Sequence, residues 1–430
     1  MEASVLTPNC RLEPYWWRAA PHSKEKAATL PNSADVAIVG SGITGLVAAI
    51  RLADAGRSVV VLDAEEPGYG ASSRNAGYVG RTLKHTFGEI IESQGLNYAK
   101  RVYRELMEAF KAVEATIRSL GIECRYQPQG RFLMATSPAM YEAMLREFEL
   151  RAKHLGEPFA PVTRAEQESE INTELYHGGV RIEDHAGLHP GLYHQGLLAA
   201  AKARGVPVNG FTPVAEITGE GGRFQVHTPV GSLSTRDVLV ATNGYTGGLM
   251  PWLKRRVIPF DAYMIATEPL DPALVGRLLP TDRTYIDWNF NVDFIRRAPD
   301  DPSRILFGGL TGPRVTDLPA MAKKLYERLV RIFPALSGTR FDNVWTGRCA
   351  GTLDLYPHVG AHEGVHYALG YCFAGVPMGT WLGMKVAHRI IGYKEGESVF
   401  GERPLPSHPL YWGNPWFVPL AIRYMSRRDR

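Results

Sequence analysis

A glycine-rich turn between a strand and a helix limits the folds open to this chain more than any other feature. Residues 36–39 form an apolar run typical of a buried parallel strand, and the letters G-S-G-I-T-G follow at residues 40–45. A helical pattern then covers residues 46–55, and a second β-branched run, 58–62, ends at Asp63. These residues predict a complete βαβ unit of the dinucleotide-binding type.

Each position of this fingerprint has a physical role. Gly40 permits the tight turn, Gly42 lets the backbone approach a pyrophosphate, and Gly45 lets the helix pack closely on the strand. The helix N-terminus supplies N–H groups and partial positive charge for phosphates, and Asp63 would accept hydrogen bonds from a ribose hydroxyl. The fingerprint alone does not separate NAD from FAD, and a glycine-rich turn without any ligand is the alternative.

The segment after Asp63 distinguishes the two cofactors. Residues 68–77 read G-Y-G-A-S-S-R-N-A-G. Together with the fingerprint, this loop resembles the FAD-dependent D-amino-acid oxidase superfamily, whose members carry a G-(A/S)-S-x-R-N-(A/G)-G loop along the pyrophosphate. The resemblance covers residues 34–392, is nearest to the γ-glutamylputrescine oxidase-like and glycine or sarcosine oxidase-like branch, and includes motifs at 187–191, 241–244, 266–270, 351–360 and 370–371.

The resemblance implies an α/β fold in which a Rossmann-like FAD-binding domain is interleaved with a substrate domain of α+β type, built on a mostly antiparallel sheet. Alternating patterns between residues 259 and 310 independently predict such a sheet. The predicted FAD-binding domain is 30–90, 185–250 and 340–395, and the predicted substrate-binding domain is 91–184 and 251–339. Residues 396–430 are predicted to form a tail packed on the body.

The resemblance also implies which residues hold FAD, and that they hold it without a covalent bond. Cys349 lies three residues before Thr352, whereas the flavin-linked cysteine of sarcosine oxidases lies further upstream in that motif. We therefore expect Cys349 and Cys372 to be small buried residues. The predicted FAD contacts are Gly40, Gly42, Ile43, Thr44, Gly45, Asp63, Ala64, Ser72, Ser73, Arg74, Asn75, Ala76, Gly77, Val214, Ala241, Thr242, Gly375, Val376, Pro377, Met378 and Gly379.

The activity implied by the resemblance is oxidation of a C–N bond in an amine or N-substituted amino compound to an imine, with hydride transfer to flavin N5. Dioxygen would then reoxidise the flavin and yield hydrogen peroxide. Two alternatives stay open: an amine dehydrogenase that passes electrons to a quinone or carrier protein, and a protein that binds FAD without turnover.

Three departures from the family bear on the chemistry. The superfamily's G-(Y/F)-S-G-H-G turn appears at residues 370–375 as G-Y-C-F-A-G, without the Gly-His pair. Pro377 stands where sarcosine oxidases keep a lysine for the substrate carboxylate, and Ile305 or Leu306 stands near their oxygen-activating lysine. These departures speak against a small α-amino acid as substrate and against a standard oxidase half-reaction.

Three residues are candidates for substrate contact. Arg81 and Arg348 could each pair with a substrate anion through a planar fork, or could be surface arginines. Tyr263 lies on a predicted strand of the sheet that would cover the flavin, so it either lines the cavity or packs in the core.

Composition excludes other classes of partner. The chain has 48 Lys and Arg against 44 Asp and Glu, a net charge of +4 over 430 residues, which argues against a nucleic-acid partner. The four cysteines are far apart, and His185, His189 and His358 fit no metal spacing, so neither disulfides nor a metal site is expected. A secretory n-region and h-region are missing before Arg11, which favours the cytoplasm.

Two long uncharged runs have about the length of a bilayer span. Residues 364–384 contain five glycines and Pro377, and residues 404–422 contain five prolines, so neither predicts a membrane helix. The prolines of the second run argue against any helix there. The aromatic pairs at 411–412 and 416–417, followed by arginines, could form a surface anchor, although a tail packed on the body is the favoured interpretation.

Overall fold

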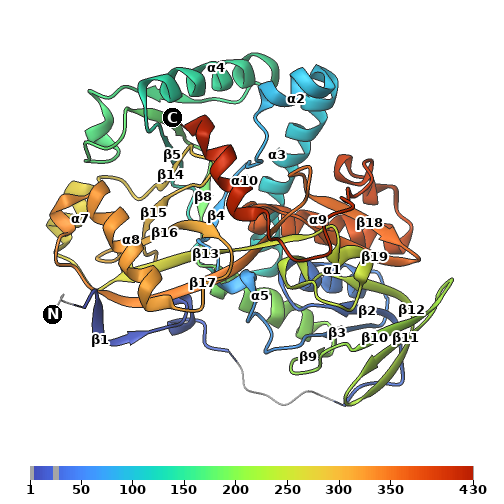
Figure 1. Ribbon diagram of the computed structural model, residues 1–430. Helices are drawn as coiled ribbons and strands as arrows, with labels where there is room; N and C mark the ends of the chain where they lie inside the picture. Colours follow the sequence, from blue (N-terminus) through green and yellow to red (C-terminus); the bar gives the residue numbers. More distant parts are fainter. Residues whose placement is uncertain (1–3, 23–28, 430) are drawn as a thin grey trace.

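Two large sheets organise the chain (Figure 1). The computed structural model describes residues 4–22 and 29–429. One sheet has the path β10-β11-β12-β2-β3-β9, with β19 beside β12 and β18 beside β19. Its strands are β2 (Ser33–Val39), β3 (Val59–Leu62), β9 (Val208–Asn209), β10 (Glu216–Glu220), β11 (Arg223–Thr228), β12 (Gly231–Val240), β18 (His358–His362) and β19 (Val365–Leu369).

The centre of this first sheet is parallel. Val39 of β2 is in register with Leu62 of β3 on one side and with Val240 of β12 on the other. Buried strands of this kind are apolar along their whole length, which explains the β-branched runs in the sequence. The predicted βαβ unit is confirmed, because α1 (Ile43–Asp54) joins β2 to β3.

Helices cover one face of the parallel sheet. α1 packs against α9 (Gly375–Ile391) and α5 (Pro190–Ala203), and α9 packs against α3 (Leu96–Leu120). Residues 87–120 keep apolar positions at helical spacing but form two helices, α2 (Phe87–Gln94) and α3, because Gly95 adopts φ +85° between them. Residues 91–184 were predicted to belong to the substrate-binding domain. Within them, α3 packs on α9, beside the first sheet.

The second sheet is mostly antiparallel, as expected. Its path is β1-β17-β13-β16-β15-β14-β5-β7-β6, and only the pairs β1/β17 and β14/β5 are parallel. The strands are β1 (Leu6–Arg11), β5 (Arg131–Met134), β6 (Ala160–Val162), β7 (Gly179–Ile182), β13 (Ile258–Thr267), β14 (Thr284–Asp287), β15 (Phe294–Arg297), β16 (Ile305–Gly312) and β17 (Phe341–Gly351). Because β17 pairs with β13 here, the change of sheet follows Gly351 and not residue 340.

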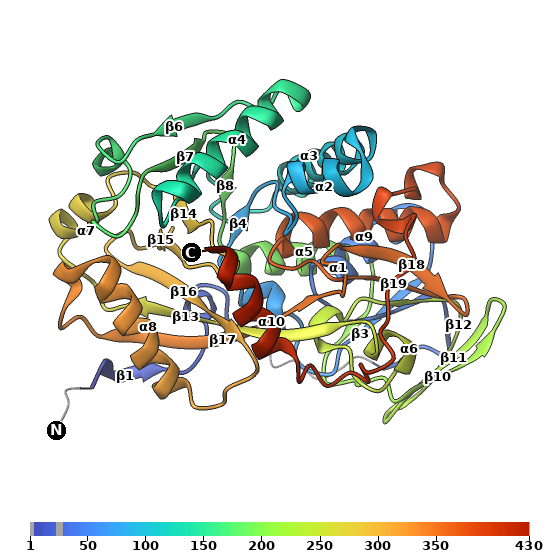
Figure 2. The same ribbon diagram turned by 45° about the horizontal axis from the view of Figure 1, so that its top comes forward.

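Further helices surround this second sheet (Figure 2). α8 (Leu318–Ile332) packs on β13, β16 and β17, and its buried residues share a core with Tyr263 and Phe307. The remaining helices and the short strand pair are α4 (Pro138–Leu155), α6 (Pro251–Lys254), α7 (Pro272–Leu278), α10 (Val418–Met425), β4 (Tyr78–Val79) and β8 (Ala186–Gly187).

The expectation that residues 404–422 contain no helix is wrong at their end. α10 begins at Val418 and includes Pro419, which lies in the first helical turn, where a missing N–H costs nothing. Among the described residues, no helix has the length and apolar character that a bilayer span requires.

Candidate active site

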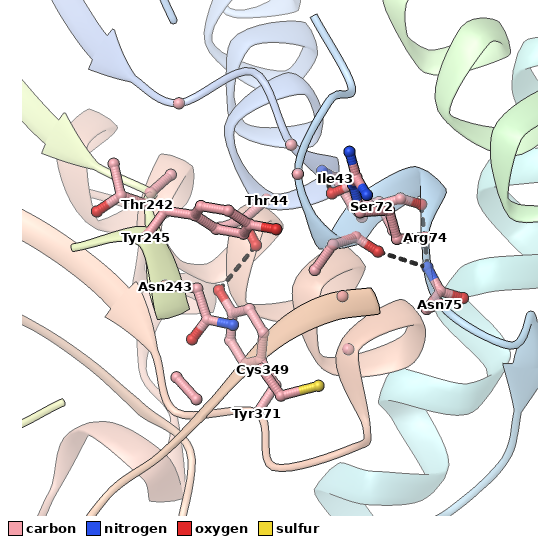
Figure 3. A pocket seen from close by; sticks show the side chains of 18 of the residues that line it. Ile43, Thr44, Ser72, Arg74, Asn75, Thr242, Asn243, Tyr245, Cys349 and Tyr371 are labelled. Atoms are coloured by element: carbon pink, nitrogen blue, oxygen red, sulfur yellow. Dashed lines mark hydrogen bonds between the residues drawn. The ribbon is translucent and has the colours of Figure 1, made fainter. Parts of the chain in front are cut away.

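A cavity of about 450 Å³ lies between the two sheets (Figure 3). Its floor is formed by the carboxyl ends of β2, β3 and β12, and its roof by one face of β13 and β17. The predicted FAD contacts that line it are Gly40, Gly42, Ile43, Thr44, Asp63, Ala64, Ser72, Arg74, Asn75, Ala76, Val214, Ala241, Thr242, Gly375 and Val376. Segments up to 336 residues apart in the sequence thus meet in one place.

The glycine turn forms the narrowest part of this floor. Gly40 adopts φ +104°, and a Cβ there would lie 3.0 Å from the carbonyl oxygen of Ala241. A Cβ on Gly42 would lie 2.8 Å from the Ser72 hydroxyl, which accepts a hydrogen bond from the Ile43 N–H at 2.9 Å. The N-terminus of α1 therefore faces the cavity through backbone that carries no side chain, a fit for a pyrophosphate.

Asp63 is fixed at the end of β3. One of its carboxylate oxygens accepts hydrogen bonds from the Ser41 N–H at 2.7 Å and the Ser41 hydroxyl at 2.5 Å, and the other accepts from the Glu65 N–H at 3.1 Å. Because Asp63 also lines the cavity, its carboxylate is held where the fingerprint places a ribose acceptor.

The loop over residues 68–77 is ordered by its own polar groups. The Arg74 guanidinium lies 4.6 Å from the Trp17 ring centroid and 4.4 Å from that of Tyr69, and it donates to the Tyr69 and Thr346 carbonyls. The Asn75 amide donates to the Ser72 carbonyl at 3.0 Å (Figure 3). These contacts present the loop as a preformed wall.

Six of the predicted FAD contacts do not line the cavity: Gly45, Ser73, Gly77, Pro377, Met378 and Gly379. They support the residues that do. A Cβ on Gly45 would lie 2.0 Å from the Gly40 carbonyl oxygen, and one on Gly77 would lie 2.1 Å from that of Leu188. A Cβ on Gly379 would lie 3.2 Å from the Thr44 hydroxyl, so this glycine lets α9 approach α1.

The roof of the cavity is apolar. Ala262 and Met264 face it from β13, Phe294 from β15, and Gly347 and Cys349 from β17. Successive residues of a strand point to opposite faces, so the alternate positions of β13 and β17 point away. β17 comes close to the loop over residues 68–77 here, because a Cβ on Gly347 would lie 3.2 Å from the Arg74 Cβ.

This alternation places Tyr263 and Arg348 on the far side of the roof. Tyr263 is 1% exposed, and its hydroxyl donates to the Pro313 carbonyl and accepts from the Val315 N–H at 2.6 Å. Arg348 pairs with Asp261, at 3.0 Å between Nε and Oδ1. Neither residue lines the cavity, so the core interpretation of Tyr263 holds and Arg348 has an internal partner.

Arg81 is neither a surface arginine nor part of the cavity lining. Its side chain is 1% exposed and binds Asp184 through two hydrogen bonds, at 2.7 and 3.0 Å, and Glu157 at 3.3 Å. Arg151 also binds Glu157. The Arg81 guanidinium, which the sequence suggested as a substrate contact, instead links the residues after β4 to the residue pair that follows α4 and β7, Glu157 and Asp184.

Several residues at the cavity were missed from the sequence. Tyr371 lines it and shares a hydrogen bond of 2.7 Å with Thr44 (Figure 3), and Tyr245 and Phe373 line it too. Cys372 and Phe373 adopt positive φ, 40° and 74°, in the turn whose family pattern has a glycine. That departure in the motif was the available signal.

Lys84 was also missed, three residues after Arg81. Its ammonium lies 4.7 Å from the Phe290 ring centroid and 4.8 Å from that of Phe373, and it donates to the Phe290 carbonyl at 2.7 Å. Burial raises the pKa of the Cys372 thiol, and the Lys84 charge opposes that rise.

Comparisons with known proteins agree with this geometry. The family model for FAD dependent oxidoreductase, DAO, matches residues 35–389. The γ-glutamylputrescine oxidoreductase of Escherichia coli is 30% identical over 92% of this chain and 93% of its own length. The glycine oxidase of Geobacillus kaustophilus is 23% identical over 82% of this chain and 92% of its own.

Solved structures share the fold. A crystal structure of Geobacillus kaustophilus glycine oxidase superposes with a TM-score of 0.73 at 21% identity, over 88% of this chain and 99% of that one. The L-proline dehydrogenase of P. horikoshii gives a TM-score of 0.71 at 18% identity, over 91% and 99% of the two chains.

Proposed function

The chain belongs to the DAO family of FAD-dependent oxidoreductases, and from this we propose that it oxidises a C–N bond of an amine or N-substituted amino compound to an imine, with dioxygen as acceptor and hydrogen peroxide as product. One observation carries the proposal: a single cavity joins a dinucleotide-binding floor to an apolar roof. Two of the relatives are named γ-glutamylputrescine oxidoreductase and glycine oxidase.

The chain's own residues prepare both reactants. Bound FAD would supply the two-electron acceptor for a hydride from the carbon beside the amine nitrogen. Gly40, Gly42 and the start of α1 would hold the pyrophosphate, and Asp63 the ribose hydroxyls. The apolar roof, with Met264 and Phe294, excludes water and so favours the neutral amine over the ammonium, because burial disfavours charge.

We propose that the flavin is bound without a covalent link. Burial raises the pKa of the Cys349 thiol to about 12, and burial raises that of Cys372 as well. Both thiols line the cavity. A thiol is nucleophilic only as its thiolate, so at neutral pH both side chains are poor partners for attachment.

For the substrate we propose that recognition of a carboxylate beside the amine is weak. The two cations that the sequence suggested as anion contacts, Arg81 and Arg348, are engaged in internal ion pairs. Pro377 lies buried within α9 and offers no charge to a carboxylate beside the amine.

An anaerobic titration tests the activity. Amines are added to the yellow holoenzyme, and the loss of the visible flavin absorbance is followed. Air is then admitted, and the hydrogen peroxide formed is measured. We expect bleaching followed by stoichiometric peroxide. If no amine in a broad panel bleaches the flavin, the proposal fails and FAD binding without turnover is favoured.

An amine dehydrogenase is the second candidate. Ile305 and Leu306, near the position where sarcosine oxidases keep an oxygen-activating lysine, are both buried in β16 and carry no charge. Rapid turnover with an artificial quinone acceptor, together with slow reoxidation by air after bleaching, would favour this candidate over the oxidase.

A further inference from the structure

Exposed apolar side chains gather on the segment 410–427. Twelve large hydrophobic residues are exposed in the described part of the chain, and five of them fall between residues 410 and 424. They are Leu410, Trp412, Trp416, Leu420 and Tyr424, with 59–68% of each residue accessible. Single exposed apolar residues need no explanation, but such a cluster marks an interaction surface.

The opposite side of the same segment is anchored to the body. Tyr411 is buried, and its hydroxyl donates to the Val257 carbonyl at 2.5 Å. Val418 is buried with Tyr411 and Ile258, and Ile422 packs against them. The exposed side chains therefore project from a segment held in place, and both views show α10 in front of the second sheet (Figures 1 and 2).

Helical spacing aligns the exposed residues. Trp416, Leu420 and Tyr424 are four residues apart, so they follow one ridge along α10 and the turn before it. Arg423 and Arg427 are exposed and also four apart, which gives a basic ridge next to the apolar one. The Trp412 ring has the Arg255 guanidinium 3.8 Å from its centroid. Apolar and basic side chains therefore lie side by side on this surface.

This composition matches the headgroup layer of a lipid bilayer. Trp and Tyr prefer the boundary between lipid and water, and each arginine near an anionic surface adds attraction. Residues 403–430 include five arginines and a single acidic residue, Asp429. The surface is therefore complementary in charge to anionic lipid.

A second copy of the chain is a poorer occupant. In a two-fold symmetric dimer the same patch meets itself, which would bring Arg423 and Arg427 toward the same arginines of the other copy. That repulsion opposes self-association through this face, whereas an anionic bilayer is attracted by the same charges.

We propose that this surface, formed by Leu410, Trp412, Trp416, Leu420, Tyr424, Arg423 and Arg427, binds the headgroup layer of an anionic bilayer and holds the protein there peripherally. The proposal is independent of the proposed chemistry, since none of these residues lines the cavity.

Vesicle sedimentation with the full-length holoenzyme tests it. The wild type should pellet with vesicles of phosphatidylcholine mixed with phosphatidylglycerol, bind pure phosphatidylcholine far more weakly, and be released by high salt. A triple variant, Trp416→Ser with Leu420→Ser and Tyr424→Ser, and a double variant, Arg423→Gln with Arg427→Gln, should each reduce binding by about tenfold or more.

Two controls keep the outcome readable. Val230→Ser removes an equally exposed apolar residue far from this segment and should leave binding unchanged. Flavin content and amine turnover in solution should be unaffected in every variant, which reports that the fold is intact. A wild type that stays in the supernatant with anionic vesicles overturns the proposal, and so does a triple variant that pellets like the wild type. A dimer lost in the triple variant, without vesicle binding, would instead assign this face to self-association.

Discussion

Replacing Gly42 tests the most specific part of the site. In the structure a Cβ at this position would lie 2.8 Å from the Ser72 hydroxyl, which is closer than side chains normally approach. Gly42→Ala must therefore displace Ser72, whose hydroxyl accepts the Ile43 N–H. Losing that hydrogen bond costs about 0.5–1.5 kcal/mol, which corresponds to FAD binding weakened by about two- to tenfold.

Gly42→Leu should abolish FAD binding at micromolar concentrations, because its side chain would occupy the path of the pyrophosphate. Apoprotein is titrated with FAD, and quenching of flavin fluorescence gives the dissociation constant. Gly247→Ala is the matched control, since Gly247 lines the same cavity and a Cβ there meets no atom within 4 Å. A folded Gly42→Leu protein with wild-type affinity for FAD, or an equal loss in Gly247→Ala, would refute this account of the turn.

Three further predictions follow from the described contacts. Acid precipitation should release all of the FAD, and Cys349→Ser and Cys372→Ser should leave that release unchanged; flavin fluorescence retained in the wild-type pellet would contradict the assignment. Arg81→Met should lower the free energy of unfolding in urea by about 3 kcal/mol. This is the low end for a broken buried ion pair, because Glu157 still has Arg151 as a partner. We expect kcat/KM to change less than about twofold; a larger kinetic effect without destabilisation would restore Arg81 as a substrate contact. Burial lowers the pKa of His189 from 6.5 to about 4, so between these values the unfolded chain binds more protons and stability falls as the pH drops, by at most about 1.4 kcal/mol per pH unit. His189→Asn, which keeps an N-cap acceptor for α5, should reduce the fall in Tm between pH 6.5 and 5, and the remaining fall is expected from His185 and His194, whose pKa values burial also lowers; an unchanged slope would contradict the prediction.

Local patterns were sufficient for the parallel half of the fold. The run before Gly40 and the run before Asp63 are the buried strands β2 and β3, and the helical pattern between them is α1. These elements are specified by contiguous residues, whose apolar character and caps are visible in the sequence. The break at Gly95 was hidden because apolar positions keep helical spacing on both sides of it.

The substrate side of the site could not be predicted in the same way. Both faces of β13 are covered, one by α8 and the other by the cavity, so Tyr263 and Met264 are equally buried. Alternation identifies two faces but not which of them faces the ligand. Arg81 posed a different difficulty, because its partners Asp184 and Glu157 are distant in sequence. A sequence does not distinguish an arginine buried in ion pairs from one that is available to a substrate.

The order of strands in the first sheet has a consequence for biosynthesis. β2 leaves the ribosome early, yet its neighbour β12 ends at Val240 and β19 ends at Leu369. The turn at 371–376 that closes the cavity comes later still. A nascent chain therefore cannot complete the cofactor cradle until the residues through Val376 have been translated, at about 5–20 residues per second. Flavin can be enclosed only after that point, however early β2 and α1 form.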